Sequence, residues 1–495
     1  MLRNGWGLLM VSMALAGCGD TSSSSEDAGR VVRTDTGPGT LPTDSGTPGG
    51  GTDGGTAEVL PAWQWDHVLD AAGGFDQGRA IAVASTGHIV VVGPYAGALQ
   101  FDGTSYPSQG DKDIFVARFM PDGTPDWIRT FGSDAYDSCR SVAIDAGGNI
   151  YLAGQYSGAG MTIAEGAPLP YAVDNGKDIF VASLDATGAH RWSHGYGGPG
   201  TDSGDGIAVQ GELVVAVGFF QQTVSLPSEE VTSAGESDIF VLGMNRSGVT
   251  QWQRTFGGPE NDQALGVAMA DNDKAYVVGH FGGTVTFGEM GGKAAISTTA
   301  SDLFVLKINS DGLETQFAQF GGSETNTIGR HIAITDERGV VVAGKFNGTL
   351  SFPGTSLTSV GTDGVLIRLN NTLEHRWHRV LPATGRVRVR GLAWNDGQVY
   401  TIGQYTETFT PDAVEMTSVG ADDVFIAAYA DGVAGATPLW AQTYGSPGLD
   451  WGLGVAVHGD LLYATGALRG DTDFGGGVRT IGDDGEVFLF AQRVR

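Results

Sequence analysis

The chain has 495 residues, of which 80 are glycine, 41% are hydrophobic and 17% are charged. This apolar content supports a large core and excludes a chain that is disordered throughout, and the glycine content predicts many tight turns. Acidic residues outnumber basic ones by 56 to 28, giving a formal net charge of −28. Such a surface repels nucleic acid, so we expect no nucleic-acid partner.

Residues 1–17 have the pattern of a secretory signal peptide: Arg3, then a short apolar run over residues 8–15, then small residues before Cys18. The run is shorter than the roughly 20 apolar residues that span a bilayer. Residues 15–18, Leu-Ala-Gly-Cys, resemble a lipobox, which implies that Cys18 is diacylated and anchors the chain to a membrane. The alternative is an ordinary signal peptide with an incidental cysteine.

Residues 18–60 are dominated by Gly, Ser, Thr, Pro and Asp, with almost no apolar side chains. We expect a disordered tether between the lipid anchor and the folded body. Gly19, rather than Asp, follows the cysteine, which favours the outer membrane over the inner one. We therefore expect a cell-envelope protein, either periplasmic or surface-exposed.

From residue 61 to the end, one pattern repeats seven times at a step of 60 to 65 residues. An acidic residue opens an apolar run at Asp113, Asp178, Asp238, Asp302, Asp363, Asp423 and Glu486. An aromatic residue keeps the same step at Trp65, Trp127, Trp192, Trp252, Phe317, Trp377 and Trp440. Apolar triplets begin at Ile81, Val142, Ile207, Val267, Ile332, Leu392 and Val455. Valine-rich runs end at Gly93, Gly154, Gly218, Gly279, Gly344, Gly403 and Gly466.

Each repeat thus predicts four short strands, named here a (the triplet), b (the run ending in glycine), c (opened by the acidic residue) and d (with the aromatic residue). This pattern predicts an all-β, seven-bladed β-propeller with four antiparallel strands per blade. The a–b and c–d links are tight turns, whereas the b–c and d–a links are longer. In an antiparallel sheet the two longer links emerge at one end, so we expect a loop face and an opposite hairpin face. Small residues beside the triplet predict that strand a lines the axis.

The order of strands along the chain predicts how the ring closes. A d-type strand at residues 63–69 precedes the first a strand, and the last repeat ends after its c strand at residues 487–492. The N-terminal strand should complete the last blade, which removes an exposed sheet edge. Residues 61–495 then form a single domain, because no blade buries its faces alone.

At this point the repeats resemble a known family. Their cores include residues 207–209 (Ile-Ala-Val), 348–352 (Gly-Thr-Leu-Ser-Phe) and 238–241 (Asp-Ile-Phe-Val), and they are similar to the SBBP-type seven-bladed β-propeller repeat of bacterial exported proteins. The resemblance covers residues 63–493 and departs most at Asp363 and Glu486. It implies the fold and an extracytoplasmic setting, and it implies no reaction.

An aspartate recurs five places before the strand-a triplet, at Asp76, Asp137, Asp202, Asp262 and Asp450. A partial ring of carboxylates near the loop face is a candidate calcium site, since calcium prefers several hard oxygen ligands. The alternative is that each carboxylate supports its own turn by accepting backbone N–H bonds. No segment matches a calcium-binding loop, so we expect no cofactor, with calcium as the alternative.

Two sets of basic residues are candidate ligand-binding groups. Arg79, Arg140, Arg330 and His331 stand beside the axial triplets and predict an anion site at the channel mouth. Arg386, Arg388 and Arg390 alternate along the strand entering blade six, so period-2 spacing places them on one side. An anionic partner fits there, and pairing with neighbouring aspartates is the alternative.

For two histidines and one cysteine, the sequence predicts a structural role and no metal site or reactive thiol. His375 and His378 flank Trp377, and strand alternation predicts that they point to opposite faces and share no metal. Cys139 takes a position that is Gly or Ala in four other repeats, which predicts a small packing residue rather than a reactive thiol.

Two classes of function fit these features. The first is a non-enzymatic binding or scaffolding module for protein or glycan, held as a monomer at the membrane by its lipid. We identify no catalytic residues in this reading. The alternative is a propeller enzyme of the lyase or hydrolase type, with its site at the channel mouth on the loop face. Convergence of Arg79, Arg140, Arg330 and His331 around one pocket would favour the enzyme.

Overall fold

The structure, a computed structural model, describes residues 61–494 except 172–175, 272, 288–293, 298–299, 323–325, 413 and 483. These residues belong to the compact unit Ala57–Arg495, which is separate from the unit Met1–Thr56. The predicted signal peptide, the lipidation site Cys18 and the tether lie outside the described residues. Within the described part of the chain, no helix is long and apolar enough to cross a membrane.

Seven antiparallel sheets of four strands form the blades of a β-propeller, as the sequence predicts. In the order a to d, blade 1 is β3 (Ala80–Val83), β4 (Ile89–Tyr95), β7 (Asp113–Phe119) and β8 (Pro125–Phe131). Blade 2 is β9 (Ser138–Ile144), β10 (Ile150–Tyr156), β11 (Asp178–Leu184) and β12 (His190–Tyr196). Blade 3 is β13 (Ser203–Gln210), β14 (Leu213–Phe220), β17 (Asp238–Asn245) and β18 (Thr250–Phe256). Blade 4 is β19 (Gln263–Ala270), β20 (Lys274–Phe281), β23 (Asp302–Ile308) and β24 (Glu314–Phe320).

The remaining blades follow the same order. Blade 5 is β25 (Asn326–Ile334), β26 (Val340–Asn347), β29 (Asp363–Leu369) and β30 (His375–Leu381). Blade 6 is β31 (Val387–Asn395), β32 (Gln398–Tyr405), β35 (Asp423–Gly432) and β36 (Gly435–Tyr444). Blade 7 is β37 (Trp451–His458), β38 (Leu461–Leu468), β41 (Glu486–Arg493) and β1 (Ala62–Leu69).

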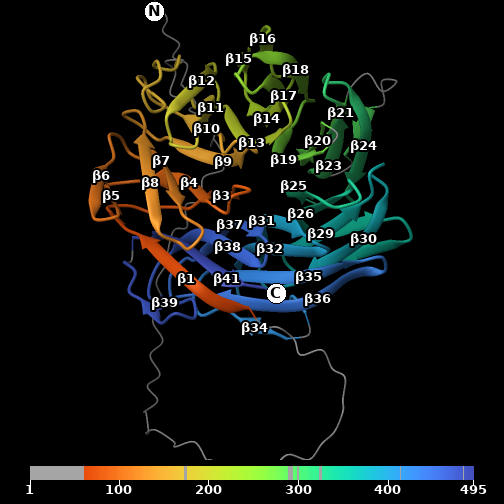
Figure 1. Cartoon of the computed structure of the whole chain (residues 1–495). Helices are drawn as coiled ribbons and strands as arrows, with labels where there is room; N and C mark the ends of the chain where they lie inside the picture. Colours follow the sequence, from red (N-terminus) through yellow and green to blue (C-terminus); the bar gives the residue numbers. More distant parts are fainter. Residues whose placement is uncertain are drawn as a thin grey trace, which may run out of the picture. The chain divides into compact units, whose positions relative to one another are not determined.

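The blades form a closed ring around the a strands, which lie nearest the centre in Figure 1. Each a strand contacts the a strand of the next blade, and β37 of blade 7 contacts β3 of blade 1. Among the described residues, the buried apolar side chains fall into seven clusters, each shared by two adjacent blades. Every blade therefore depends on both neighbours for burial of its faces.

The N-terminal strand closes the ring as predicted. β1 pairs antiparallel with β41, with Trp63 opposite Gln492 and Leu69 opposite Val487. Asp66 of β1 also forms an ion pair with Arg479, at 2.5 Å. The last sheet thus has the order β1-β41-β38-β37, in which the first and the last strand of the described residues share one blade.

Strand a carries a β-bulge near its loop-face end, which the sequence analysis did not predict. In blade 2, Cys139 lies opposite Gly154 and Ser141 lies opposite Ala153, so Arg140 is the extra, unpaired residue. The same register shift occurs in blades 3 to 7. In blades 2 to 7 a strand-a carbonyl oxygen lies within 1.9–2.2 Å of where a Cβ would stand on the glycine near the end of strand b, and in blade 1 the Gln77 carbonyl oxygen lies 1.7 Å from that place on Gly93. The bulge therefore explains why glycine recurs at that position in all seven repeats.

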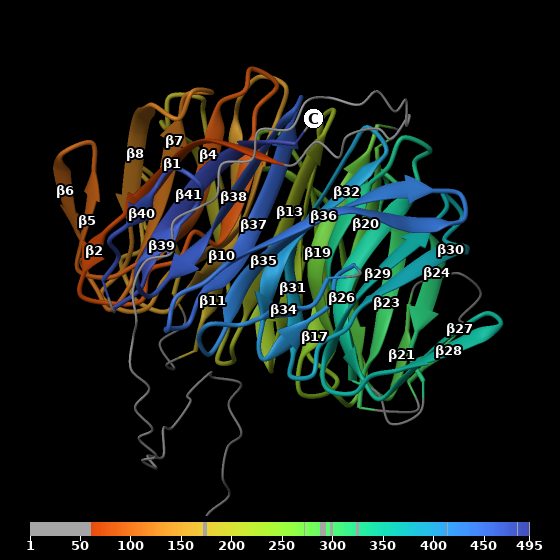
Figure 2. The same cartoon turned by 90° about the horizontal axis from the view of Figure 1, so that it is seen from below.

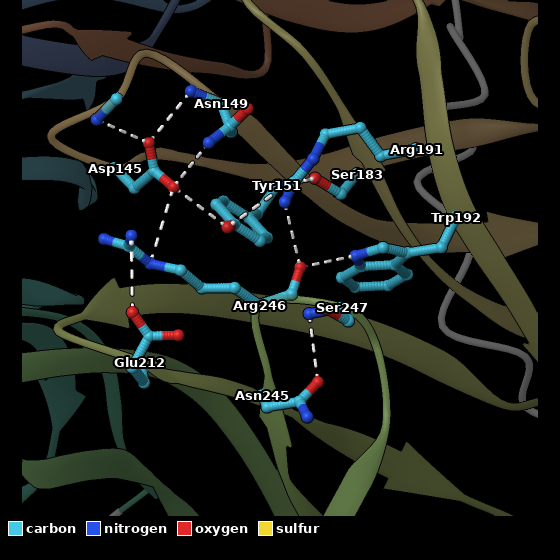
Figure 3. Close-up of polar contacts among 11 residues, drawn as sticks. Asp145, Asn149, Tyr151, Ser183, Arg191, Trp192, Glu212, Asn245, Arg246 and Ser247 are labelled. Atoms are coloured by element: carbon cyan, nitrogen blue, oxygen red, sulfur yellow. Dashed lines mark hydrogen bonds and ion pairs between the residues drawn. The ribbon is translucent and has the colours of Figure 1, made fainter.

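On the hairpin face, the aromatic residue of strand d joins neighbouring blades. Trp192 of blade 2 lies against Gly248 in the c–d turn of blade 3 and donates its Nε1–H to the Arg246 carbonyl at 2.8 Å. Figure 3 shows this junction, where the Arg246 guanidinium also reaches Asp145 and Glu212, each at 3.6 Å. The same tryptophan-to-carbonyl bond is made by Trp127 and Trp252. These contacts confirm that the strand-d aromatics pack between adjacent blades.

Most of the long b–c links fold into accessory hairpins, which the sequence analysis did not predict. They are β5 (Ala98–Phe101) with β6 (Thr104–Pro107) and β2 (Ala71–Ala72), β15 (Thr223–Ser225) with β16 (Glu230–Thr232), β21 (Thr284–Thr286) with β22 (Ala294–Ile296), β27 (Thr349–Phe352) with β28 (Thr355–Thr358), β33 (Thr408–Phe409) with β34 (Met416–Thr417), and β39 (Thr472–Asp473) with β40 (Val478–Arg479). Figure 2 shows β5–β6 and β27–β28 projecting at the rim of the ring. The turn at Asp102-Gly103, with φ of 48° and 73°, is a hairpin signal that was present in the sequence.

Candidate functional site

The bulges place one unpaired residue of each blade at the central channel, near the loop face. In blade 1 the equivalent residue is Arg79. Before it, the Gln77 N–H donates to Pro94 O, and after it, Ala80 lies opposite Val92. We call the seven residues the channel ring: Arg79, Arg140, Asp205, Leu265, Arg330, Arg390 and Leu453. Four of these seven side chains are arginine, in a chain with only 28 basic residues.

The ring side chains converge on one another. Arg140 of blade 2 forms an ion pair with Asp205 of blade 3, with Nη1 and Oδ1 at 2.8 Å. Burial, together with the positive charges of Arg140 and Arg330, lowers the pKa of Arg79 to about 10. Blades 1 and 5 are not neighbours, so the effect of Arg330 on Arg79 acts across the channel. All four arginines are half-buried, as expected for side chains that line an interior passage reached by water.

Two histidines lie within this positive field. His331 follows Arg330, and its pKa is lowered to about 3 by burial and by the charges of Arg330, Arg390 and Arg79. His280 on strand b of blade 4 also has its pKa lowered to about 3, by burial and then by Arg330 and Lys345. Both imidazoles are therefore neutral at pH 7.

A second group of cations lies at the blade 1 and blade 2 side of the channel. The Lys177 ammonium lies 4.9 Å from the centre of the Tyr136 ring. Burial alone would raise the pKa of Tyr136, but the charges of Arg79, Arg140, Lys112 and Lys177 outweigh it and lower the pKa. A phenol that is acidified despite burial reports a strongly positive local potential.

Several polar atoms at the ring have no hydrogen-bond partner within the protein. They include Arg140 Nε, Asp205 Oδ2, His280 Nδ1 and Gln404 Nε2. Gln404 belongs to this group because its Oε1 accepts a bond from Arg390 Nε at 3.3 Å. Buried polar atoms without partners are costly, so three orphan N–H or imidazole groups near the arginines mark a place that an acceptor-rich ligand would satisfy.

The structure brings Arg79, Arg140, Arg330 and His331 together, as the sequence analysis predicted. Along the strand that enters blade 6, Arg386, Arg388 and Arg390 are half-buried and alternate with the buried Val387 and Val389. The bulge between Val389 and Gly391 leaves Arg390 unpaired, which makes it the channel-ring residue of blade 6. Arg386 instead forms an ion pair with Asp422 at 2.7 Å, and Arg388 lies opposite Gln404.

The recurring aspartates are spread over the loop face, each within its own blade. Asp262 accepts the N–H of Gly258 at 2.7 Å in the d–a link and the N–H of Gly282 at 2.9 Å in the b–c link. Backbone N–H groups likewise bond to the carboxylates of Asp76, Asp137, Asp202 and Asp450. This geometry favours the turn-supporting role over a shared calcium site. Among the described residues, no three His, Cys, Asp or Glu side chains gather as a metal site would require.

These loop-face aspartates predict how stability depends on pH. Burial raises the pKa of Asp76 to about 8 and those of Asp202 and Asp262 to about 7, although backbone N–H bonds oppose the shift. At pH 7 the folded chain then holds protons that the unfolded chain has released, so stability falls as pH rises. We expect the thermal midpoint to rise by several degrees when pH is lowered from 8 to 6.5, measured by circular dichroism.

The control for this prediction is Asp76→Asn, which should flatten the pH dependence because it removes one of the titrating groups. The pH range of this test stops at 6.5 because of His280 and His331, whose pKa values are lowered in the folded chain. Below the pKa of an unfolded histidine, the unfolded chain binds protons that these two residues do not, so stability falls as the pH is lowered further. A thermal midpoint that rises from pH 6.5 to 8 would contradict the direction of these shifts.

The prediction that His375 and His378 point to opposite faces of their strand is wrong. His375 Nε2 and His378 Nδ1 lie 3.1 Å apart, and both rings pack on Phe352. At the start of β30, Trp377 lies opposite Arg368 and His375 lies opposite Leu369, so Arg376 is the extra residue of a β-bulge. This bulge removes the strict alternation of side chains. Cys139 is fully buried, with its Sγ near the carbonyl oxygens of Ser141 and Ala153, which confirms its packing role.

Comparisons with known proteins give distant likenesses. No family model matches the chain. The chain is 26% identical over 381 residues to the regulatory protein FlaEY of Caulobacter vibrioides, which is 71% of this chain but only 38% of that protein. The chain therefore spans well under half the length of this relative.

Among solved structures, a protein of unknown function from Dyadobacter fermentans is 10% identical to this chain, with 88% of this chain and 99% of that one covered and a TM-score of 0.40. A Trypanosoma rangeli sialidase in complex with sialic acid shares 11% (86% of this chain, 55% of that one, TM-score 0.34). These TM-scores are too low to support any inference about function.

Proposed function

We propose that the protein is a lipid-anchored module of the bacterial cell envelope that binds or scaffolds a protein or a glycan at its loop face. In this proposal Cys18 carries the lipid, the segment 18–60 is the tether, and the SBBP-like propeller is the binding body. The outer membrane is the proposed location, and the chain acts as a monomer.

The observation that carries this proposal is the composition of the channel ring. A chain with net charge −28 gathers Arg79, Arg140, Arg330 and Arg390 at one end of its axis. The same loop face carries the b–c links, whose accessory hairpins differ in length and sequence between blades. Variable loops around a rigid scaffold with a distinct central charge are typical of a binding surface.

The enzyme remains the second candidate, because Arg79, Arg140, Arg330 and His331 converge in the way a channel-mouth lyase or hydrolase needs. Arginines there would stabilise a developing negative charge. His331 is the nearest candidate base, but a pKa of about 3 makes its imidazole a poor proton acceptor at neutral pH. This mismatch is the reason to prefer binding over catalysis.

The binding proposal is tested by cross-linking the full-length chain to its surroundings in envelope extract and mapping the linked positions. The expected result is one enriched protein or glycan, cross-linked on the loop face near Lys112 and Lys177. Links confined to the hairpin face, or no enrichment over a bead control, would overturn the proposal. Cleavage of an extracted glycan that is lost in His331→Ala would favour the enzyme instead.

The anchor is tested by Cys18→Ser. We expect this variant to lose labelling by a radioactive or clickable fatty acid and to leave the membrane fraction, because the acyl chains supply the membrane affinity. The measurement is fractionation of cells followed by immunoblotting of membrane and soluble fractions. Retention of the variant in the membrane at the wild-type level would refute lipidation.

A further inference from the structure

We propose that the channel ring binds a ligand carrying at least two oxyanion groups, either carboxylates or phosphates, between two pairs of arginines. The inference rests on the proposed binding function and names the chemical class of its ligand. The ring residues concerned are Arg79 and Arg140 on one side and Arg330 and Arg390 on the other.

The arrangement of blades separates the arginines into two pairs. Arg79 and Arg140 come from the adjacent blades 1 and 2, and Arg330 and Arg390 from the adjacent blades 5 and 6. Between the pairs lie Leu265 of blade 4 with Asp205 of blade 3 on one side, and Leu453 of blade 7 on the other. A ligand with one oxyanion facing each pair and a less polar body beside the leucines matches this distribution.

The backbone fixes the positions of the Cα atoms from which the arginine side chains extend. In blades 2 to 7 the ring residue is the unpaired member of a bulge, held on both sides by strand pairing with strand b, and in blade 1 Arg79 donates its N–H to Val92 O. The seven a strands contact one another around the axis. The glycines near the end of strand b admit these bulges. Arginines on such a rigid base lose little freedom on binding, which favours affinity for an anion.

Without a ligand, the ring holds its positive charges at a cost. Asp205 forms an ion pair with Arg140, and the charges of Arg140 and Arg330 both lower the pKa of Arg79. An oxyanion between the pairs would replace repulsion with charge-assisted hydrogen bonds and would offer acceptors to Arg140 Nε and Gln404 Nε2, which have no partner in the protein.

The test titrates the full-length chain, purified in a non-ionic detergent at low ionic strength, with citrate and separately with pyrophosphate by calorimetry. We expect one site per chain for at least one probe, and the preferred probe tells whether carboxylates or phosphates are recognised. Arg330→Gln should weaken binding by about tenfold or more, because it removes one guanidinium of a pair. Arg376→Gln, which removes the same charge from an exposed position on β30, should leave the affinity unchanged.

A second variant tests the site by gain of binding. Asp205→Asn removes the one acid of the ring and releases Arg140 from its ion pair, so the affinity for the preferred probe should increase by severalfold. The thermal midpoint of each variant shows that it is folded, and saturating ligand should raise the midpoint of the wild type. An unchanged or weakened affinity in folded Asp205→Asn would count against the ring as the binding site.

Two outcomes overturn the inference. The first is the absence of binding by either probe at millimolar concentration, and the second is equal weakening by Arg330→Gln and Arg376→Gln, which indicates non-specific attraction. If neither anion binds while a macromolecular partner is still cross-linked on the loop face, the anion site fails and the binding function stands. If an anion binds with the expected variant pattern but no partner is found, the anion site stands and the protein-or-glycan proposal fails.

Discussion

Deleting residues 58–70 should destabilise the whole propeller and lower its thermal midpoint by on the order of 10 °C, with a strong tendency to oligomerise. The deletion removes β1, the strand that supplies the outer edge of blade 7 and joins the two ends of the chain. It also removes the partner of Arg479, since Asp66 lies on β1. β41 would then present an unpaired edge whose side chains are almost all buried in the intact protein.

The effect should spread beyond blade 7. β1 buries Leu69 and half-buries Trp65 and Val68; full burial of a side chain such as Leu69 contributes about 2 kcal/mol, and the two half-buried side chains add a part of theirs. Trp65 lies against Gly123 in the c–d turn of blade 1, so its loss also opens the junction between blades 7 and 1. Because each apolar cluster is shared by two blades, a break at one junction weakens both of its neighbours.

The control is a deletion of residues 19–57, whose composition gives it almost nothing apolar to bury. We expect this variant to keep the wild-type thermal midpoint and to elute as a monomer. The measurements are thermal unfolding by circular dichroism and size-exclusion chromatography with light scattering. Equal stability and a monomeric state for both deletions would show that β1 does not hold the ring closed.

Gly279→Ala should lower the stability of the propeller by about 3 kcal/mol, the upper end of what an added methyl costs in a well-packed interior. Gly279 lies near the end of strand b of blade 4, and a Cβ there would stand 1.9 Å from the Gln263 carbonyl oxygen and 2.8 Å from Phe304 Cε1. The obstruction includes backbone, so a change of side-chain rotamer cannot relieve it. The strand-a bulge of blade 4 would have to open.

The matched control is Gly147→Ala, in the exposed a–b turn of blade 2. A Cβ at this position meets only the ends of the Asp145 and Asn149 side chains, at 3.2 and 3.3 Å. We expect a change within about 0.5 kcal/mol, as for most surface substitutions. Urea and thermal midpoints measure both variants, and similar midpoints for the two would contradict the explanation given for the recurring glycines.

Local sequence pattern was sufficient for the architecture because each blade repeats the same strand periodicity and turn residues. The acidic residue that opens strand c and the aromatic residue of strand d each recur seven times, which indicated the number of blades. The strand at residues 63–69, lying before any strand a, indicated the closure that β1 and β41 form. The gathering of Arg79, Arg140, Arg330 and His331 also followed from their shared place beside the axial triplets.

The tertiary structure decided what depends on bulges, because a single extra residue reverses which side of a strand the later side chains occupy. Simple alternation separated His375 from His378, and the structure brings them together. The effect of Arg330 on Arg79 across the channel is likewise invisible in the sequence, since blades 1 and 5 face each other only when the ring closes. The sequence by itself thus determined the repeat, the strands and the closure, and only the folded ring decided which side chains face one another along its axis.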